Sequence, residues 1–465
     1  MIPILHKDIS IQGLPKFESL TKLKITEQIN DHATASISGI LQDQLTTEEV
    51  YRLGIGSNIR INTGSEVIFT GVPVGLEIKS ISGVNHLSVT LKSHSYKLDI
   101  KRRSRSFQDV GNTYYDVFAQ IVNYEYHGVV FNTTSKEKQQ GQLIIEYKET
   151  DWQFLKRLAS QLNTIIYPYM DADKPQIGVG IPAGKQYTER QFQYAMSKTV
   201  GEYSKNESNF PGWGELDFVS DNIESSEVYK LCDVVIHNEV KYLVAKKISE
   251  MCNGVLSNTY SLRNLDSFKQ NIIYNEKLTG ISLEGKVIAV NGDKVKLHLV
   301  SIDQNQDIGT AYWFDYDTPY TAENHKGAYI MPENGTVVHL YFPHRDERRS
   351  YIRKVLRKDG VLNPKTKNPN IKYFETINGK ELKLTPDSLS LTARHGKVYM
   401  SMTEGGGISF ISSGDILIKG PEINVSGEAV HIKAADSLSM KSSSASILVE
   451  TEIDIKGAGL VNFFG

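Results

Sequence analysis

Short apolar pairs alternate with polar turns along the C-terminal stretch, from about residue 381 to residue 456. In most of the pairs two apolar residues flank one polar residue, which is the two-residue period of a strand with one apolar face. Gly, Ser, Asp, Asn and Pro, which turn a chain sharply, lie between the pairs. The pairs are Leu382/Leu384, Leu389/Leu391, Val398/Met400, Ile408/Phe410, Ile416/Ile418, Ile423/Val425, Val430/Ile432, Leu438/Met440, Ile447/Val449 and Ile453/Ile455.

Strands this short cannot bury their apolar face within one winding, so the repeats must stack on one another. A single chain would leave an apolar stripe exposed, whereas three identical chains wound together enclose it and leave no free sheet edge. We therefore predict an intertwined homotrimeric β-helix over residues 375–465, a rod on the order of 50 Å long. The alternatives are a single-chain β-solenoid and an up-and-down β-meander. The residues predicted to fill the trimer core are Ile416, Ile418, Ile423, Val425, Val430, Ile432, Leu438, Met440, Ile453 and Ile455.

The first hundred residues also alternate between apolar and polar positions, with glycine-containing turns, which predicts a small β-barrel over about 1–100. Three short segments of this region are echoed later, in the same order, and predict a second, related barrel over about 165–275. Three chains with two like barrels each would present six similar units in a ring, and such a ring could meet a six-fold partner. The echoed pairs are 50–54 with 228–232, 66–69 with 239–242, and 90–93 with 261–264.

Two helices are predicted between the barrels, so that residues 1–275 form one hub domain. The first runs from Thr113 to about Tyr124, with Asn112 or Thr113 as its cap. The second begins at Thr150, and Gln153 three residues later completes a capping box. The polar stretch from about residue 170 to 226 predicts loops and short strands.

Residues 149–159 read Glu-Thr-Asp-Trp-Gln-Phe-Leu-Lys-Arg-Leu-Ala. This run resembles the hub motif of contractile-tail spike proteins, namely the VgrG spikes of type VI secretion and the tail hub and late-control proteins of contractile phages. Trp152 is expected to be a packing anchor rather than a residue that stacks on a ligand. The motif residues are Asp151, Trp152, Phe154, Leu155, Arg157 and Leu158.

A further compact β domain is predicted over residues 280–360. Asn291-Gly292 lies between two alternating runs and marks a two-residue hairpin, as in a small OB-type barrel. The pattern Pro-Glu-x-Gly-x-x-Val-x-Leu-x-Phe at 332–342 is similar to the OB domain of the same spike family. The order of hub, OB domain and β-helix also resembles that family, so the resemblance covers essentially the whole chain.

Charge does not favour a nucleic-acid partner, because the 465-residue chain has a formal net charge of only −2. The basic run Lys101, Arg102, Arg103 and Arg105 is expected to be a solvated turn or a subunit contact. A second cluster, between residues 345 and 358, lacks interleaved aromatic residues and is expected to stabilise a hub–OB or subunit junction. Cys232 and Cys252 are expected to be buried free thiols. The second cluster comprises Arg345, Arg348, Arg349, Arg353, Lys354, Arg357 and Lys358.

No catalytic motif is present: the chain has no Gly-x-Ser-x-Gly, no His-Glu-x-x-His and no P-loop. We therefore expect no enzymatic activity, no cofactor and no metal ion. Some phage relatives carry a lysozyme domain before the β-helix, but the connecting stretch 359–374 is too short for one. The N-terminus shows no signal-peptide pattern, so synthesis in the cytoplasm is expected.

The last residues are apolar and would expose aromatic rings at the tip of a trimeric rod. The family resemblance implies that a small conical, PAAR-like tip protein docks there. Folding of Phe463 and Phe464 back into the rod is the alternative. His431 stands alone, so no metal site built on a pair of histidines near the tip is expected. The predicted docking residues are Leu460, Val461, Phe463 and Phe464.

The sequence thus predicts a mainly β, homotrimeric spike and hub of a contractile injection particle (phage tail, R-type bacteriocin or type VI-like). Its expected partners are a hexameric tail tube protein, baseplate proteins, the tip protein and, on firing, the envelope of the target cell. A trimeric tailspike-like protein that binds or cleaves polysaccharide is the alternative.

Overall fold

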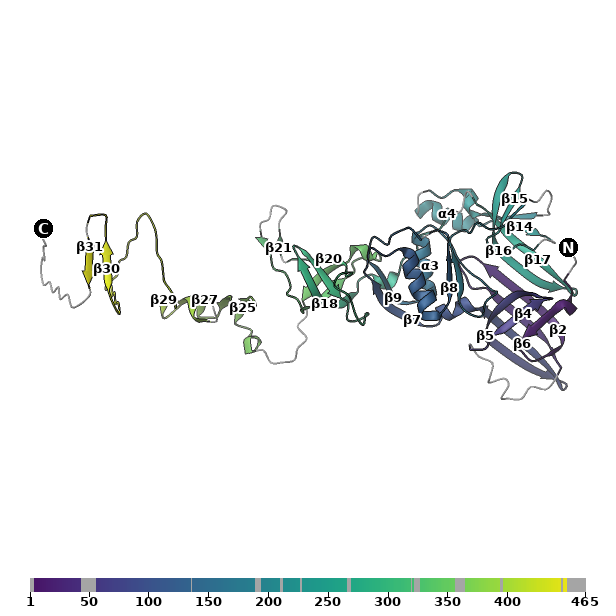
Figure 1. Cartoon of the computed structure of the whole chain (residues 1–465), viewed down its shortest axis with the longest axis horizontal. Coiled ribbons are helices and arrows are strands. Elements are labelled where there is room, and N and C mark those ends of the chain that lie inside the picture. Colours follow the sequence, from purple (N-terminus) through teal and green to yellow (C-terminus); the bar gives the residue numbers. More distant parts are fainter. Residues whose placement is uncertain are drawn as a thin grey trace. The chain divides into compact units, whose positions relative to one another are not determined.

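The computed structural model divides the chain into two compact units, residues 1–358 and 359–465. Figure 1 labels the elements of both units, and each unit is described by itself. The structure describes residues 4–42, 56–134, 136–188, 194–209, 212–225, 228–265, 269–318, 320–321, 327–355, 364–393, 396–444 and 446–449.

A 12-stranded sheet dominates the first unit, and its main path runs β1-β4-β5-β6-β3-β2-β16-β17-β14-β13. β15 pairs with both β16 and β12 beside this path. β2 and β16 pair antiparallel and join the N-terminal strands to the later ones. The bounds are β1 (Ile9–Gln12), β2 (Phe17–Gln28), β3 (Thr34–Leu41), β4 (Ile59–Thr63), β5 (Glu66–Ile81), β6 (Val84–Ser93), β12 (Gln186–Thr188), β13 (Tyr194–Lys198), β14 (Val219–Glu224), β15 (Val234–His237), β16 (Val240–Cys252) and β17 (Val255–Asn264).

The β5–β6 hairpin is repeated as the β16–β17 hairpin, and corresponding residues differ in number by 171. Gly71 opposes Ser93 as Tyr242 opposes Asn264. The register shifts once in each hairpin, between Pro73 and Gly75 and between Val244 and Lys246, so that Val74 and Ala245 are the bulged residues. Both hairpins end in two-residue turns, Ser82-Gly83 and Asn253-Gly254. Two segments of the chain therefore share one strand register.

The echo seen in the sequence reflects this repeat in part. Residues 90–93 and 261–264 occupy matching positions of β6 and β17. Residues 66–69 begin β5 and residues 239–242 span the start of β16, but the two segments are two residues out of step with the structural register. Residues 50–54 lie outside the described residues. The division of the hub into two barrels stays a prediction.

A helical layer and short strands follow β6, and both predicted helices are confirmed. α2 (Tyr114–Ala119) continues as a π-helical turn over Gln120–Glu125, and α3 (Asp151–Gln161) follows β9 directly. Thr113 and Thr150 cap these helices, each in a complete capping box. The strands of this layer are β7 (Arg102–Phe107), β8 (Val129–Asn132), β9 (Ile144–Thr150), β10 (Ile166–Pro168) and β11 (Gln176–Val179).

The sequence missed α4 (Val200–Asn209), which lies within the stretch expected to hold only loops and short strands. α4 has no apolar stripe, so no helical period was visible in its sequence. The ring of Tyr203 lies 5.8 Å from that of Phe218, which joins the helix to the following chain. The expectation of two buried thiols is also wrong in part: Cys232 is buried, but Cys252, at the tip of the β16–β17 hairpin, is exposed.

A five-stranded sheet of order β20-β19-β18-β23-β24 completes the first unit. β9 ties it to the helical layer, because Ile144 packs in the core around α2 and α3 while Leu143 and Ile145 pack in the core of this sheet. The bounds are β18 (Ser282–Asn291), β19 (Lys294–His298), β20 (Trp313–Asp315), β23 (Val337–Tyr341) and β24 (Tyr351–Val355), with the small pair β21 (Tyr320–Thr321) and β22 (Gly327–Ala328) beside them.

The second unit contains a five-stranded antiparallel meander and a separate hairpin. The meander strands pair in chain order, and β30 (Leu438–Lys441) pairs with β31 (Ser446–Val449). Between them, residues 412–437 form no strand, although strands were predicted at Ile416/Ile418, Ile423/Val425 and Val430/Ile432. A strand needs a hydrogen-bonding partner, and the described part of the single chain offers none there. The meander comprises β25 (Lys372–Glu375), β26 (Glu381–Leu384), β27 (Ser388–Ala393), β28 (Val398–Thr403) and β29 (Gly407–Ile411).

Candidate functional site

The hub motif lies on α3, beside β9 (Figure 1). The side chains of the motif are buried. Trp152, Phe154, Leu155 and Leu158 pack in the apolar core of the helical layer. Trp152 is 3% exposed, in keeping with its expected role as a packing anchor. The two charged residues of the motif are also buried, and each enters a different ionic cluster.

Arg157 connects α3 to the strand before it and to the five-stranded sheet region. Its Nη2 lies 2.8 Å from Oε1 of Glu149, and its Nη1 lies 3.0 Å from Oε1 of Glu347. Nη2 also donates to the carbonyl of Ile145, at 2.6 Å. Burial alone would lower the pKa of Arg157, but the carboxylates of Glu347 and Glu149 hold it above its ordinary value. We call Arg157, Glu149 and Glu347 the Arg157 clamp.

Asp151 anchors the second cluster, at the start of α3. Its carboxylate accepts hydrogen bonds from Arg105 and from the hydroxyl of Tyr126. Nε of Arg103 lies 3.2 Å from Oδ2 of Asp151, and Arg103 also pairs with Glu125 at 2.8 Å. Burial, together with the adjacent Asp151 carboxylate, raises the pKa of Tyr126 to about 12.

The basic run 101–105 is therefore not simply a solvated turn or a subunit contact. Arg103 and Arg105 belong to β7, whose antiparallel pairing with β9 places Arg105 opposite Glu146. Arg105 pairs with this carboxylate, which is fully buried. Burial raises the pKa of Glu146, and the charge of Asp151 adds to this effect against that of Arg105.

Two residues of the second basic cluster pair with carboxylates of their own unit. Arg345 contacts Glu276 at 2.6 Å, and Arg348 pairs with Asp346. Glu347, which lies between Asp346 and Arg348 in the sequence, is the residue that contacts Arg157. The sequence did not identify Glu347 as a site residue. Glu149 was within the quoted motif stretch, but Glu347 has no periodic or motif signal around it.

One face of the meander in the second unit carries two apolar rows, which we call the apolar ladder. In the first row, Phe374 opposes Leu382, Leu382 opposes Leu391, Leu391 opposes Met400, and Met400 opposes Phe410. The second row lies two residues away on the same face, in the order Leu384, Leu389, Met402 and Ile408.

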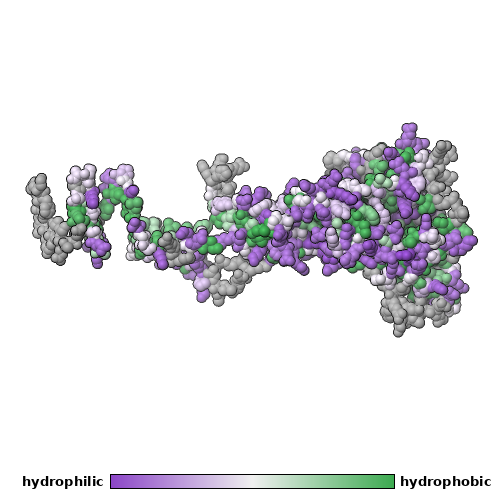
Figure 2. Space-filling model, in the orientation of Figure 1, coloured by the Kyte–Doolittle hydropathy of each residue, from purple (hydrophilic) through white to green (hydrophobic). Residues whose placement is uncertain are grey.

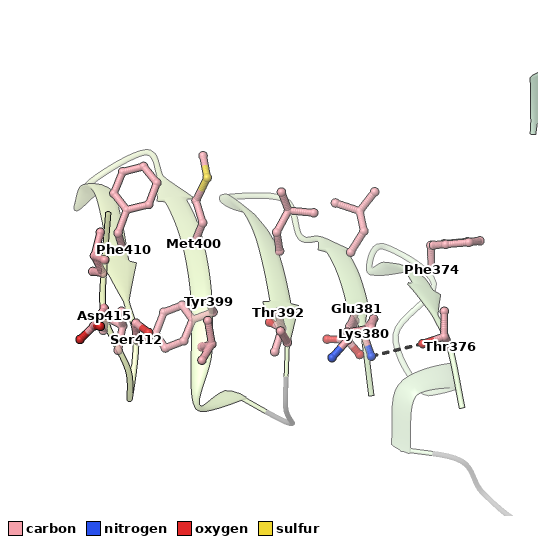
Figure 3. Close-up of a pocket in the computed structure, with 16 residues that line it drawn as sticks. Phe374, Thr376, Lys380, Glu381, Thr392, Tyr399, Met400, Phe410, Ser412 and Asp415 are labelled. Carbon is pink, nitrogen blue, oxygen red and sulfur yellow. Dashed lines mark hydrogen bonds between the residues drawn. The ribbon is translucent and has the colours of Figure 1, made fainter. Parts of the chain in front are cut away.

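The opposite face of the meander is mainly polar, with Tyr373, Lys383, Ser390, Ser401 and Ser409 in register, although Ile411 also lies on it. Figure 3 shows Met400 and Phe410 projecting to the same side of the strands. Both residues line a hollow of about 520 Å³. Phe410 and Ile408 are each 63% exposed and Phe374 is 50% exposed in the single chain. An apolar face of this extent is unusual for a surface left to water.

The predicted trimer-core residues between β29 and β30 are likewise exposed, and Figure 2 shows hydrophobic surface along this extended part of the second unit. Exposed fractions range from 52% at Ile423 to 74% at Val425. Leu438 and Met440 lie in β30. Ile453 and Ile455 fall outside the described residues, as do the predicted tip residues Leu460, Val461, Phe463 and Phe464.

Two further properties concern the described residues only. They contain no group of three or more His, Cys, Asp or Glu side chains that could hold a metal ion. In the same part of the chain, no helix is long and apolar enough to cross a membrane.

Comparison with known proteins identifies the fold. A family model described as the Alg8 N-terminal domain matches residues 5–197. No curated protein matches the chain. Among solved structures, the E. coli c3393 protein is 13% identical, covers 75% of this chain and 99% of its own, and has a TM-score of 0.55. It is described as a component of the type VI secretion system with structural similarity to the T4 bacteriophage tail proteins gp27 and gp5.

Two structures of a PdpA–VgrG complex are also similar, and the half-lidded one is from Francisella. The half-lidded form is 10% identical, covers 88% of each chain and has a TM-score of 0.54. The lidless form is 10% identical, covers 86% of this chain and 97% of the other, and has a TM-score of 0.52. At these identities the likeness shows the fold alone: this mainly β chain has the fold of the type VI secretion component and of the VgrG complexes.

Proposed function

We propose that three copies of this VgrG-like chain form the hub and spike of a contractile, tail-like injection particle. The apolar ladder is the observation that carries this proposal. Its nine side chains are aligned across five strands, so they form one continuous surface rather than scattered exposed residues. Fully burying one such side chain stabilises a protein by about 1.5–3 kcal/mol. Covering a ladder that is roughly half exposed is therefore worth on the order of 10 kcal/mol per chain.

Three copies of the chain meet this requirement with their own surfaces. Three ladders that face one another enclose a dry prism and leave the polar faces toward water. Residues 412–437 continue the same logic, because their apolar pairs lack strand partners in the single chain and gain them when three chains intertwine. This supports a β-helix, with the hairpin β30–β31 continuing it.

The hub would hold the spike to the tube. The β5–β6 and β16–β17 hairpins share one register, so three chains would present six similar units to a hexameric tail tube protein. The five-stranded sheet, which we interpret as the OB domain, is tied to α3 through the Arg157 clamp. Baseplate proteins and a PAAR-like tip protein at Leu460, Val461, Phe463 and Phe464 complete the proposed assembly.

The proposed action is mechanical. Contraction of a sheath supplies the work, the hub receives it from the tube, and the rod concentrates it on a narrow tip that breaches the target envelope. No residue of this chain needs to perform a chemical step, and we propose that it is not an enzyme.

Two measurements on the full chain test the proposal. Light scattering after size exclusion should give the mass of a trimer, and a tagged chain should retain the tube protein of the same particle in a pull-down. A reducing-sugar assay on envelope polysaccharides should show no release. Sugar release without tube binding would overturn the proposal in favour of the tailspike alternative, and a monomer would overturn it outright.

A further inference from the structure

The internal repeat extends beyond the two hairpins to the strands beside them. β2 pairs with β3 so that Leu23 opposes Ile37 and Lys24 opposes Ser36. β13 pairs with β14 in the same way, with Tyr194 opposite Ile223 and Ala195 opposite Asn222. Residues of β13 again carry numbers 171 higher than their counterparts in β2, as Ala195 does relative to Lys24. The ordered strands β5-β6-β3-β2 therefore recur as β16-β17-β14-β13.

Within the chain, the two sets of strands are joined through β2 and the second half of β16. Lys24 opposes Glu250, Thr26 opposes Ile248, and Gln28 opposes Lys246. Two ion pairs lie along this junction, between Lys24 and Glu250 at 2.9 Å and between Lys247 and Glu27 at 3.3 Å. We call this the internal junction.

The counterparts of both sides of the internal junction are sheet edges. Subtracting the repeat offset from the β16 side, 246–250, gives residues 75–79 of β5. Among the described strands these residues pair with β6 on one side only, because β4 pairs no further along β5 than Gly71. Adding the same offset of 171 to the residue numbers on the β2 side leads to β13. β13 ends the main path of the sheet and pairs only with β14 among the described strands.

The exposed fraction of one residue indicates that β13 lacks the neighbouring strand that covers its counterpart β2. Ile25 of β2 is buried, at 1% exposed, in the core of the first strand set. Its counterpart in β13 is Met196, which is 66% exposed. In the transposed register Met196 opposes Ile78 of β5, a partly buried residue packed against that same core.

We infer that β13 of one copy pairs antiparallel with residues 75–79 of β5 in a second copy, which repeats the internal junction between chains. Met196 opposes Ile78, and Ser197 opposes Glu77. The inference rests on the proposed function, because the trimer supplies the second copy. Each copy offers one β13 and one free β5 edge, so this head-to-tail contact closes into a ring of three copies and continues one sheet through all of them. The free edges that would otherwise invite aggregation are then paired.

Disulfide cross-linking of the full chain tests this register. Ser197→Cys and Glu77→Cys are introduced together in a chain that also carries Cys252→Ser, since Cys252 is the exposed native thiol. Directly opposite residues in an antiparallel pair have Cα atoms about 4.5–5.5 Å apart, within disulfide reach. Mild oxidation should convert most of the protein to covalent dimers and trimers on a non-reducing gel.

A matched control moves one cysteine along the same face of β5. Ser197→Cys with Ile81→Cys places the second thiol four residues away, about 13 Å along the strand and beyond disulfide reach. This pair should give less than one-tenth of the cross-linked product. Circular dichroism checks that both variants are folded, and light scattering gives the mass of each before oxidation.

The outcomes separate the interface from the oligomer. Trimers that cross-link through the test pair but not the control pair support the inference. Folded trimers in which the two pairs cross-link equally, or not at all, overturn this interface and leave the trimer of the proposed function standing. Monomers overturn both. Amide hydrogen exchange of the unsubstituted chain is a second test. The amides of residues 75–79 should exchange at least ten-fold more slowly in the trimer than in a monomer, and unprotected amides there would overturn the pairing.

Discussion

Replacing Arg157 with Met tests whether the Arg157 clamp holds the hub motif to the five-stranded sheet. The substitution keeps an unbranched, apolar side chain in the space but removes the guanidinium. Glu149 and Glu347, whose side chains are 8% and 2% exposed, then lie buried without their cation. Breaking a buried ion pair by removing one partner costs about 3–5 kcal/mol. This is a large part of the roughly 5–15 kcal/mol that stabilises a typical folded domain.

Urea unfolding of the full chain, followed by circular dichroism at fixed protein concentration, measures this loss as a lower midpoint for the first unit. Glu347→Gln keeps a hydrogen-bond acceptor near Arg157 and should cost about 1–3 kcal/mol. The double variant should cost less than the sum of the two single variants by about 0.5–3 kcal/mol, because both act on one network.

Arg348→Met is the matched control, one position beyond Glu347. Arg348 pairs with Asp346, but its side chain is 55% exposed, so the change should cost less than about 1 kcal/mol. If Arg157→Met destabilises the chain no more than Arg348→Met, the clamp contributes little and the reasoning is refuted.

Three further predictions follow from single sites. Burial, with the nearby charge of Lys97, lowers the pKa of His94 to about 4, so an unfolded chain binds more protons between pH 6.5 and 4. The stability contributed by neutral His94 is therefore present above pH 6.5 and falls by about 3 kcal/mol as the pH drops to 4. Urea midpoints should show this loss, and an equally steep loss in His94→Gln would contradict it. Thr150→Ala removes the cap of α3 and should cost about 1–2 kcal/mol by urea unfolding. Thr150→Ser should recover most of this loss, and equal losses in both would contradict the capping role. Leu391→Asp places a charge on the apolar ladder and should lower the urea concentration at which light scattering shows the trimer to dissociate, whereas Ser401→Asp on the polar face should not. Equal resistance to urea in the two variants would contradict the buried ladder.

Local signals in the sequence were enough to place both helices of the hub layer. A capping box needs only residues three apart, so Thr150 could be identified as a cap without any knowledge of the tertiary structure. For the first helix the sequence left Asn112 and Thr113 as candidates, and the structure shows Thr113 as the cap. The ionic partners of Arg105 could not be found in this way. Glu146 is 41 residues distant and becomes its neighbour only through the pairing of β7 with β9.

The apolar pairs of the C-terminal stretch show where the prediction of strands from alternation succeeds and where it fails. Alternation correctly predicted strands where the chain supplies its own partner, as at Leu389/Leu391 in β27 and Ile408/Phe410 in β29. At Ile423/Val425 the same pattern gave no strand in the single chain. Alternation reports which face a residue would present, but hydrogen-bonding partners decide whether a strand forms.

The internal repeat explains why its sequence echo is faint while its geometry is clear. A strand that slips by one residue turns its whole apolar face outward, so register is strongly specified wherever one face is buried. Ile37 and Ile223 keep matching buried positions, and the bulges at Val74 and Ala245 fall at the same step. Exposed positions carry no such constraint, so most identities between the two segments are lost. Met196 is an exception, because it is exposed in the single chain although its counterpart Ile25 is buried. Pairing of β13 with a second copy would cover Met196 and remove this difference.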